Sequence, residues 1–328
     1  MEGCTWRRMS HPTLFPEQKV FHRSCFAMNT RFSMVLVGIE TERAEALAVA
    51  AECDLRACER MMSRFDAESP VSDLNRRATE TAIQPPEGLW EILSLCRDYW
   101  KRSRGAFDIT LWPLNHLWRE HLGRGEEPTG KAIEQARLQT GFERLHLDEI
   151  AHTVRFQSKG MSIDLGGFGK GFAIERLDGS LRAQGVEQAF LSFGESSITV
   201  LGSHPHGPAW PVGITNMFQP SDTVHTFHLR NASLSSSGTA PFNRMGGPQV
   251  FGQNIDPRNG RPLEGYRTIS VVSPSGIEAE VLSTALLVTP ERDRAALISG
   301  FSTISAIEIV YRTNAGKFVP CIEWEYGL

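Results

Sequence analysis

The sequence predicts an α+β fold in which mixed, largely antiparallel sheets pack against helices. Strand-like and helical segments are mixed along the 328 residues without the strict alternation typical of a parallel sheet. Three β-like segments follow one another after Pro205. The chain has no repeat of fixed period and no long linker, so we expect a single domain over residues 21–328 with room for two lobes. Residues 1–20 are polar and contain proline, and are expected to be poorly ordered.

The first predicted elements are one strand and two helices. Residues 32–39, FSMVLVGI, are rich in β-forming side chains and predict a strand. Thr41 has the character of an N-cap, and apolar residues then recur at steps of three and four over residues 42–65, which predicts a long amphipathic helix. The segment PVSDLN at residues 70–75 closes this unit. Pro86 suits the first turn of the next helix, whose expected apolar face consists of Leu89, Ile92, Leu93, Cys96 and Trp100.

The middle of the chain predicts a loop followed by short elements. Residues 104–118 contain proline and several aromatic residues, which indicates an ordered loop. Thr129 is expected to cap a short helix that ends near Leu138. The remaining elements predicted for this part are a hairpin of residues 144–148 and 153–157, a strand at 162–165, a glycine-rich turn, a helix at 171–183 that Gly185 stops, and a strand at 188–193.

The last third of the chain is dominated by predicted strands. The expected elements are strands at 210–216, 225–230 and 233–238, a loop around 252–262, a strand at 268–273, a helix at 277–288, a second helix from Pro290, and strands at 306–312 and 318–324.

Composition excludes several classes of protein. Hydrophobic residues make up 41% and charged residues 22% of the chain, and the net charge is −4, so nucleic acid is not an expected partner. No run of about eighteen apolar residues predicts a transmembrane segment. No apolar leader is readable near the N-terminus, which predicts a cytoplasmic location. The six cysteines are scattered and form no CxxC pair, so we expect reduced thiols.

The segment DLGGFGKG at residues 164–171 has the character of an anion-binding loop. Its glycines allow backbone N–H groups to face an anion, and the helix that follows adds partial positive charge at its N-terminus. Lys170 would neutralise a phosphate, and Asp164 would accept hydrogen bonds from a ligand or orient Lys170. The alternative is an ordinary glycine-rich turn with a surface lysine.

Two acceptor side chains lie four residues apart in the segment EAEVLSTALL. Glu280 and Thr284 share one helical face, and a carboxylate with a hydroxyl suits a hard cation such as Mg²⁺. The alternative is a solvated helix face.

Further candidates lie in turns. In NIDPRNGRP, residues 254–262, Asp256 or Arg258 would touch a ligand, although a structural turn is the simpler interpretation. Asp108 in GAFDIT would recognise a ring or an amino group, or else cap its own turn. His204 and His206 flank a proline in a polar stretch, which favours a surface turn over a metal site. The serines of residues 233–237 lack the sequence context of a hydrolase nucleophile.

Taken together and in order, these stretches resemble the ApbE family of FAD:protein FMN transferases over roughly residues 27–287. The segments that carry the resemblance are Met28-Asn29-Thr30, Ser63-Arg64-Phe65, residues 70–75, residues 105–108 with Pro113-Leu114 and Trp118, residues 164–171, Ser236-Ser237-Gly238, residues 255–262 and residues 279–285.

The resemblance implies an ApbE-like fold and Mg²⁺-dependent transfer of FMN from FAD to a Thr or Ser hydroxyl of a target flavoprotein, with release of AMP. It implies metal ligation by the Glu280 and Thr284 side chains and the Gly167 carbonyl, and catalytic positions for Lys170 and Asp164 beside the phosphates. The FAD contacts that it implies are Met28, Phe65, Ala106, Phe107, Asp108, Asp164, Lys170 and Asn254.

The chain departs from the family pattern at a few positions. Glu280 stands where the family usually has Asp, and Gln253 stands where it often has a His suited to act as a base. Asn29 replaces a glycine, and Glu195-Ser196 replaces a Gly-Asp pair. Two further hypotheses therefore accompany the transferase: an FAD-binding protein of the same fold without transferase activity, and a Mg²⁺-dependent pyrophosphatase that splits FAD into FMN and AMP.

Overall fold

The computed structural model describes residues 19–239, 254–314 and 316–328. Most of the predicted N-terminal segment, residues 1–18, lies outside the described residues, as does Gln253. Lys19 and Val20 are described, and Val20 begins the first strand.

Within the described residues, eight strands form one sheet in the order β1-β2-β5-β6-β9-β12-β13-β14. Every neighbouring pair in this sheet is antiparallel. The strands are β1 (Val20–Ala27), β2 (Thr30–Val37), β5 (Ala189–Phe193), β6 (Ser197–Leu201), β9 (Ala232–Gly238), β12 (Tyr266–Ser273), β13 (Ser305–Asn314) and β14 (Lys317–Tyr326). Antiparallel pairs also join β3 (Leu145–Asp148) to β4 (Thr153–Phe156), β7 (Trp210–Asn216) to β8 (Gln219–Leu229), and β10 (Ile255–Asp256) to β11 (Arg261–Pro262).

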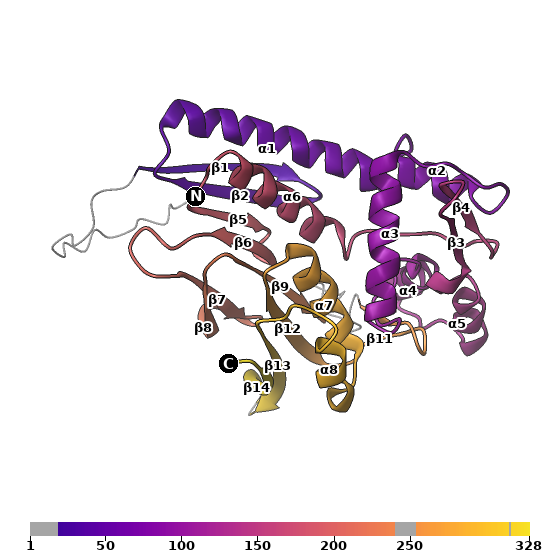
Figure 1. Cartoon of the computed structure of the whole chain (residues 1–328). Coiled ribbons are helices and arrows are strands. Elements are labelled where there is room, and N and C mark those ends of the chain that lie inside the picture. The colour runs from indigo at the N-terminus through magenta and orange to yellow at the C-terminus, as the bar shows by residue number, and fades with distance from the viewer. Residues whose placement is uncertain (1–18, 240–253, 315) are drawn as a thin grey trace.

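Helices cover one face of the large sheet and extend beyond it. They are α1 (Thr41–Met62), α2 (Pro70–Arg77), α3 (Glu87–Arg102), α4 (Trp112–Gly123), α5 (Gly130–Arg137), α6 (Gly169–Ala183), α7 (Gly276–Val288) and α8 (Glu291–Ile298). Figure 1 shows α6 and α7 against the sheet, and α1 running from the first strands toward α2. Helices α2–α5 and the β3–β4 hairpin gather at the right of the same view. The prediction of an α+β fold is confirmed.

Strand side chains alternate between two hydrophobic clusters on opposite faces of the sheet. In β12, Val271 packs into the cluster beneath the helices, whereas Val272 packs with residues of the β7–β8 hairpin. The larger cluster contains residues of β2, α1, α3, β4, α6 and α7, so one continuous core runs from the sheet into the helical part. This continuity is what the predicted single domain requires.

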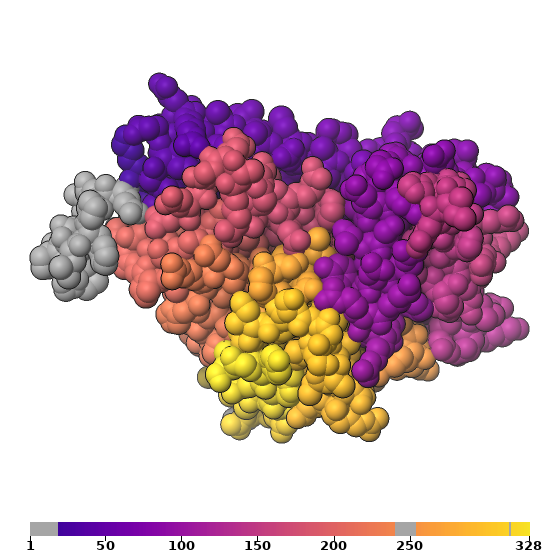
Figure 2. Space-filling view, in the orientation of Figure 1, coloured from indigo at the N-terminus to yellow at the C-terminus, as the bar shows by residue number. Residues whose placement is uncertain are grey.

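The helical part is also fixed to the C-terminal part of the chain by specific contacts. Tyr99 of α3 stacks on Phe301, which follows α8, with 6.2 Å between ring centroids. Arg102 donates to the Gly300 carbonyl and pairs with Glu278 of α7. In the space-filling view, the surface of α3 lies directly against the yellow C-terminal region (Figure 2).

Several local predictions are wrong. The predicted loop at 104–118 ends in helix α4, which carries Pro113 in its first turn, where no backbone N–H is needed. The predicted strand at 162–165 is irregular, and its Asp164 N–H donates to the Ile109 carbonyl. Thr41 is the first helical residue, and Glu40 is the N-cap, without a side-chain cap.

Two elements near the N-terminus were not predicted. Strand β1 buries little of its surface, so its sequence shows only a weak strand signal. Residues 70–75 belong to α2, which Ser69 caps by accepting from the Ser72 N–H at 3.0 Å. The capped helix predicted after Thr129 is confirmed as α5.

No helix within the described residues is long and apolar enough to cross a membrane. The described cysteines are free, as expected. The cytoplasmic location stays a prediction.

Candidate active site

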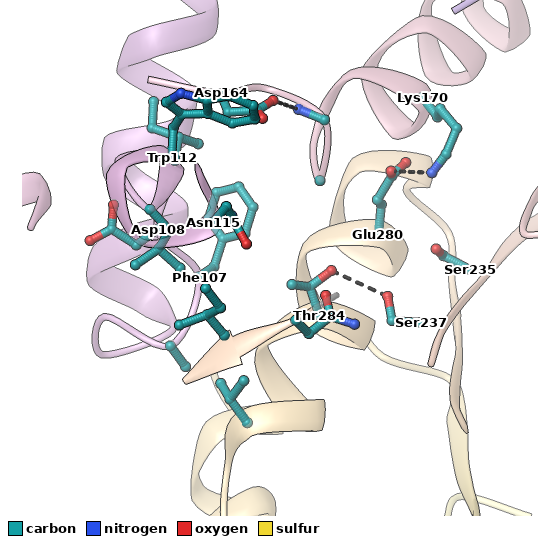
Figure 3. A pocket seen from close by; sticks show the side chains of 18 of the residues that line it. Phe107, Asp108, Trp112, Asn115, Asp164, Lys170, Ser235, Ser237, Glu280 and Thr284 are labelled. Atoms are coloured by element: carbon teal, nitrogen blue, oxygen red, sulfur yellow. Dashed lines mark hydrogen bonds and ion pairs between the residues drawn. The ribbon is translucent and has the colours of Figure 1, made fainter. Parts of the chain in front are cut away.

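A cavity of about 390 Å³ lies between two walls of the molecule. One wall is formed by residues 106–111 and α4, and the other by the start of α6, strand β9 and helix α7. Figure 3 shows Trp112 and Asn115 on one side, with Lys170, Glu280 and Thr284 on the other. The cavity therefore brings together the predicted site residues of segments 105–110, 164–171 and 278–287.

A smaller hollow of about 200 Å³ adjoins the cavity and shares Asp164, Gly166 and Lys170 with it. Met28 and Phe65, two of the predicted FAD contacts, line this hollow. Phe65 is 79% exposed, and its ring meets Trp112 edge-on, with 6.3 Å between centroids. An exposed aromatic face at the junction of two hollows is suited to contact a planar ring.

The glycine-rich turn is held in place by Asp164. Its Oδ1 accepts from the Gly166 N–H at 2.8 Å, while its own N–H donates to Ile109. A Cβ at Gly167 would meet no atom within 4 Å, so the backbone there is open to a ligand. A Cβ at Gly169 would lie 3.0 Å from the Met28 methyl group, so Gly169 allows α6 to begin close to the β1–β2 turn.

Lys170 and Glu280 form an ion pair across the start of α6. The Lys170 Nζ lies 2.7 Å from Glu280 Oε1, and Glu280 Oε2 accepts from the Gly171 N–H. Glu280 is only 2% exposed, so these donors compensate a buried negative charge. The predicted orientation of Lys170 by Asp164 is not what the structure shows, because the lysine is directed to Glu280.

Helices α6 and α7 approach closely at this point. A Cβ at Gly171 would lie 2.6 Å from the Gly276 carbonyl oxygen and 3.0 Å from the Glu280 Cβ. Only glycine fits such a contact without displacing a backbone. This close approach places Glu280 beside the N-terminal turn of α6.

Thr284 lies one turn after Glu280 and faces the same cavity, as the spacing predicts. Its Oγ1 lies 3.2 Å from the Ser237 Oγ, which in turn lies 2.8 Å from the Ser283 Oγ. These hydroxyls connect β9 to α7 and fix the orientation of the threonine.

Asp108 lines the cavity but directs its carboxylate away from the Lys170–Glu280 pair (Figure 3). Oδ1 accepts from the Thr110 hydroxyl at 2.6 Å and the Thr110 N–H at 2.7 Å. Oδ2 accepts from the Phe142 N–H at 3.1 Å. Burial raises the pKa of Asp108 from 3.8 to about 6, against the lowering effect of these hydrogen bonds. These contacts match the simpler interpretation of an Asp that caps its own turn.

The remaining candidates fall into two groups. Ala106, Phe107 and Asn254 line the cavity, and the Asn254 Nδ2 donates to the Gly238 carbonyl at 3.0 Å. Asp256 instead accepts hydrogen bonds from the backbone N–H and the guanidinium of Arg258. These contacts match the simpler interpretation of this segment as a structural turn.

His204 contacts His206 and Trp210. Among the described residues, no cluster of three or more His, Cys, Asp or Glu side chains is arranged to hold a metal ion.

The sequence did not indicate the cavity residues of α4, namely Trp112, Asn115 and Arg119. The Arg64 guanidinium packs over the Trp112 ring, 3.1 Å from its centroid, and burial lowers the Arg64 pKa to about 10. The spacing of three and four residues on α4 was the available signal, but it lay in a segment predicted as a loop. The sequence did not indicate Ser235 of β9 either, because its position in the cavity depends on the packing of β9 against α7.

Comparison with known proteins identifies the class of protein. The model of the ApbE family matches residues 28–307, and the chain therefore belongs to the ApbE family.

Individual relatives are similar over most of their length. The chain is 26% identical to a protein of Salmonella typhimurium named FAD:protein FMN transferase, over 91% of this chain and 83% of that protein. It is 27% identical to a protein of Chlamydia muridarum with the same name, over 72% of this chain and 74% of that protein. The apo crystal structure of the Pseudomonas stutzeri flavinyl transferase ApbE matches with a TM-score of 0.78 and 25% identity, over 95% of this chain and 96% of that one.

Proposed function

We propose that this protein is an enzyme that transfers FMN from FAD to a Thr or Ser hydroxyl of a target flavoprotein, with Mg²⁺ as cofactor and AMP as the second product. The observation that carries the proposal is the convergence of Lys170, Glu280 and Thr284 on one cavity of a chain that belongs to the ApbE family. The names of the relatives support the activity.

The residues at the cavity fit Mg²⁺. Glu280 supplies a carboxylate and Thr284 a hydroxyl, and both line the cavity together with Gly167, whose carbonyl is the proposed third ligand. Mg²⁺ commonly binds through one or two carboxylates, retained waters and substrate phosphates, so a protein cage of several acids is not needed. When bound, Mg²⁺ would neutralise charge on the pyrophosphate oxygens.

Lys170 is the protein's own cation at this position. It is 25% exposed while Glu280 is almost fully buried, so its ammonium group lies at the cavity surface. We infer that it contacts the phosphates while it stays within reach of Glu280. A fixed positive charge at the reacting phosphate stabilises the negative charge of the transition state without reorganisation.

Asp164 and the two hollows would hold the rest of the substrate. Within the described residues, Asp164 Oδ2 has no hydrogen bond, so it retains an acceptor for a polar edge of FAD. The other proposed contacts are Met28, Phe65, Ala106, Phe107, Asp108, Lys170 and Asn254. For Asp108 the contact would be made by its backbone, because both carboxylate oxygens already accept hydrogen bonds.

The reaction proposed is a single displacement at phosphorus. The acceptor hydroxyl oxygen bonds to the phosphorus on the FMN side, the bond from that phosphorus to the bridging oxygen breaks, and AMP leaves with that oxygen. The hydroxyl proton is released to solvent. The chain contributes by binding and orienting the reactants and by excluding water from the cavity.

The decisive experiment combines the protein with FAD, Mg²⁺ and a flavoprotein that carries an acceptor threonine. Covalent flavin on the acceptor together with AMP supports the transferase. AMP with free FMN would show a pyrophosphatase. Bound FAD that stays intact would show a binding protein, which the existing Lys170–Glu280 pair favours, because the carboxylate already has a cation.

Two variants test the metal ligands. We expect Glu280→Gln and Thr284→Val to lower Mg²⁺-dependent turnover by about 100-fold or more, since each removes an oxygen ligand. Direct titration with Mg²⁺ in the presence of FAD provides a readout other than turnover. Glu291→Gln, an exposed position on α8, is the control and should behave as the unmodified protein. Unchanged turnover in both cavity variants would remove the proposed ligand set.

A further inference from the structure

The two walls of the cavity differ in chemistry. The wall of α6, β9 and α7 carries a cation, a carboxylate and several hydroxyls. The wall of α4 presents Trp112, Asn115 and Arg119, whose spacing of three and four residues places them on one helical face. Neither the family comparison nor the proposed metal and phosphate contacts give these residues a role.

Asn115 differs from the other polar residues of the cavity because its side chain has no hydrogen-bond partner among the described residues. Its backbone N–H donates to the Leu111 carbonyl at 3.0 Å within the helix. Across the part of the chain that the structure describes, its amide makes no hydrogen bond, and Figure 3 shows it pointing into the cavity. Asn254 and Lys170, by contrast, are already bonded to Gly238 and Glu280. A half-buried amide that lacks a partner is suited to bind a ligand.

The cavity that Asn115 lines has apolar as well as polar walls. Its apolar lining residues are Ala106, Phe107, Ile109, Leu111, Trp112, Ile255 and Val288. Apolar and aromatic lining residues together with a converging polar group are typical of a site that holds a planar ring and fixes its orientation.

We propose that Asn115 is a specificity-determining residue that reads the edge of one ring of the bound dinucleotide. An amide presents one donor and one acceptor side by side, which matches a ring edge that carries a neighbouring acceptor and donor. Both adenine and the flavin ring have such an edge, so the shared chemistry is a heteroaromatic ring with adjacent donor and acceptor. This inference rests on the proposed function, because it takes FAD as the ligand.

Asn115 can be replaced without loss of a hydrogen bond to any described residue. Its side chain bonds to no described residue, and leucine is the better helix former at an interior helical position. Asn115→Leu should therefore fold and keep its melting temperature. A loss of binding in this variant then reports on the ligand. Glu120→Leu is the matched control, because Glu120 lies on the same helix, is 50% exposed and does not line the cavity.

The experiment titrates FAD, ADP and FMN separately, with Mg²⁺ present, into the full-length protein and both variants. We expect Asn115→Leu to raise the Kd for FAD by about tenfold. We expect a similar rise in Kd for only one of the two ligands ADP and FMN. The ligand that is affected identifies the ring that Asn115 binds. Asn115→Asp keeps the shape but replaces the donor by a negative charge, and should weaken the same ligand further. Glu120→Leu should leave all three constants unchanged.

Several results would overturn the inference. They are an FAD Kd within about twofold of the unmodified protein in Asn115→Leu, an equal loss for ADP and FMN, or an equal loss in Glu120→Leu. If the unmodified protein binds no FAD, the proposed function fails together with this inference. If it binds FAD and only the Asn115 effect is absent, the proposed function stands and this inference alone fails.

Discussion

At the scale of single residues, Asp108 is a carboxylate whose protonation should affect stability. Its pKa in the folded chain is about 6, above the ordinary 3.8, because it is buried. Between these values the folded state holds the proton that the unfolded state has released. The free energy of unfolding should therefore fall as pH rises from about 4 to 6 and stay level above that.

Deprotonation of Asp108 should lower the free energy of unfolding by an amount on the order of 3 kcal/mol. Each unit of pKa difference between the folded and unfolded states contributes about 1.4 kcal/mol. Urea unfolding at several pH values between 4 and 7 measures this change. Asp108→Asn cannot ionise, so the dependence on pH assigned to this residue should disappear. Asp98→Asn, on the exposed side of α3, should keep the profile of the unmodified protein. Identical profiles for all three proteins would contradict the prediction.

The sequence could predict part of the site because certain residues belong to local patterns. Lys170 follows a run of glycines, and Glu280 and Thr284 are spaced by one helical turn, so each is visible in a short window. The ion pair between Lys170 and Glu280 joins residues 110 positions apart, and no local pattern reveals it. Asn115 was not predicted because its distinguishing feature is the lack of a hydrogen-bond partner among the described residues, which only tertiary packing establishes.

At the scale of elements, the contact between α6 and α7 depends on two glycines that face each other. We expect Gly171→Ala to destabilise the protein by about 1–3 kcal/mol, because the added Cβ would lie 2.6 Å from the Gly276 carbonyl. The same Cβ would press on Glu280, so Mg²⁺-dependent turnover should fall as well. Thermal unfolding and turnover assays measure the two effects.

Gly179 offers a control within the same helix. A Cβ there would meet no atom within 4 Å, so Gly179→Ala should stabilise the protein by up to about 1 kcal/mol through helix propensity alone. If the Gly171→Ala protein proves as stable as the Gly179→Ala protein, the contact between α6 and α7 does not require glycine at position 171.

Most elements could be predicted because their apolar residues recur with the period of a helix or strand, as in α1 and β7. The failures have physical causes. Pro113 favours a loop in the sequence, although proline is acceptable in the first turn of α4. Strand β1 lies at the sheet edge and buries few side chains, so its pattern was weak. Residues 162–165 alternate buried and partly exposed side chains as a strand would, but they form no strand, so the periodicity alone was misleading.

At the scale of the whole molecule, the cavity lies between the helical part and the sheet, so a ligand must touch both. We expect FAD with Mg²⁺ to slow hydrogen exchange in α4 and α7 together, because a ligand that contacts both walls stabilises both against local opening. Mass spectrometry of exchange with and without FAD measures this effect. Strand β14, which does not line the cavity, serves as the internal control. Protection of one wall alone would contradict a ligand that spans the cavity.

Strand β14 closes the large sheet on one side, and it carries exposed apolar side chains such as Phe318, Val319 and Ile322. An open edge of this kind is a template on which other chains aggregate. Pro320, near the middle of the strand, has no N–H to offer to an incoming chain, and Glu325 adds a charge that repels a second copy, whereas Glu323 is paired with Arg312. The end of the sheet thus opposes edge-to-edge pairing of one copy with another, a property unrelated to its chemistry.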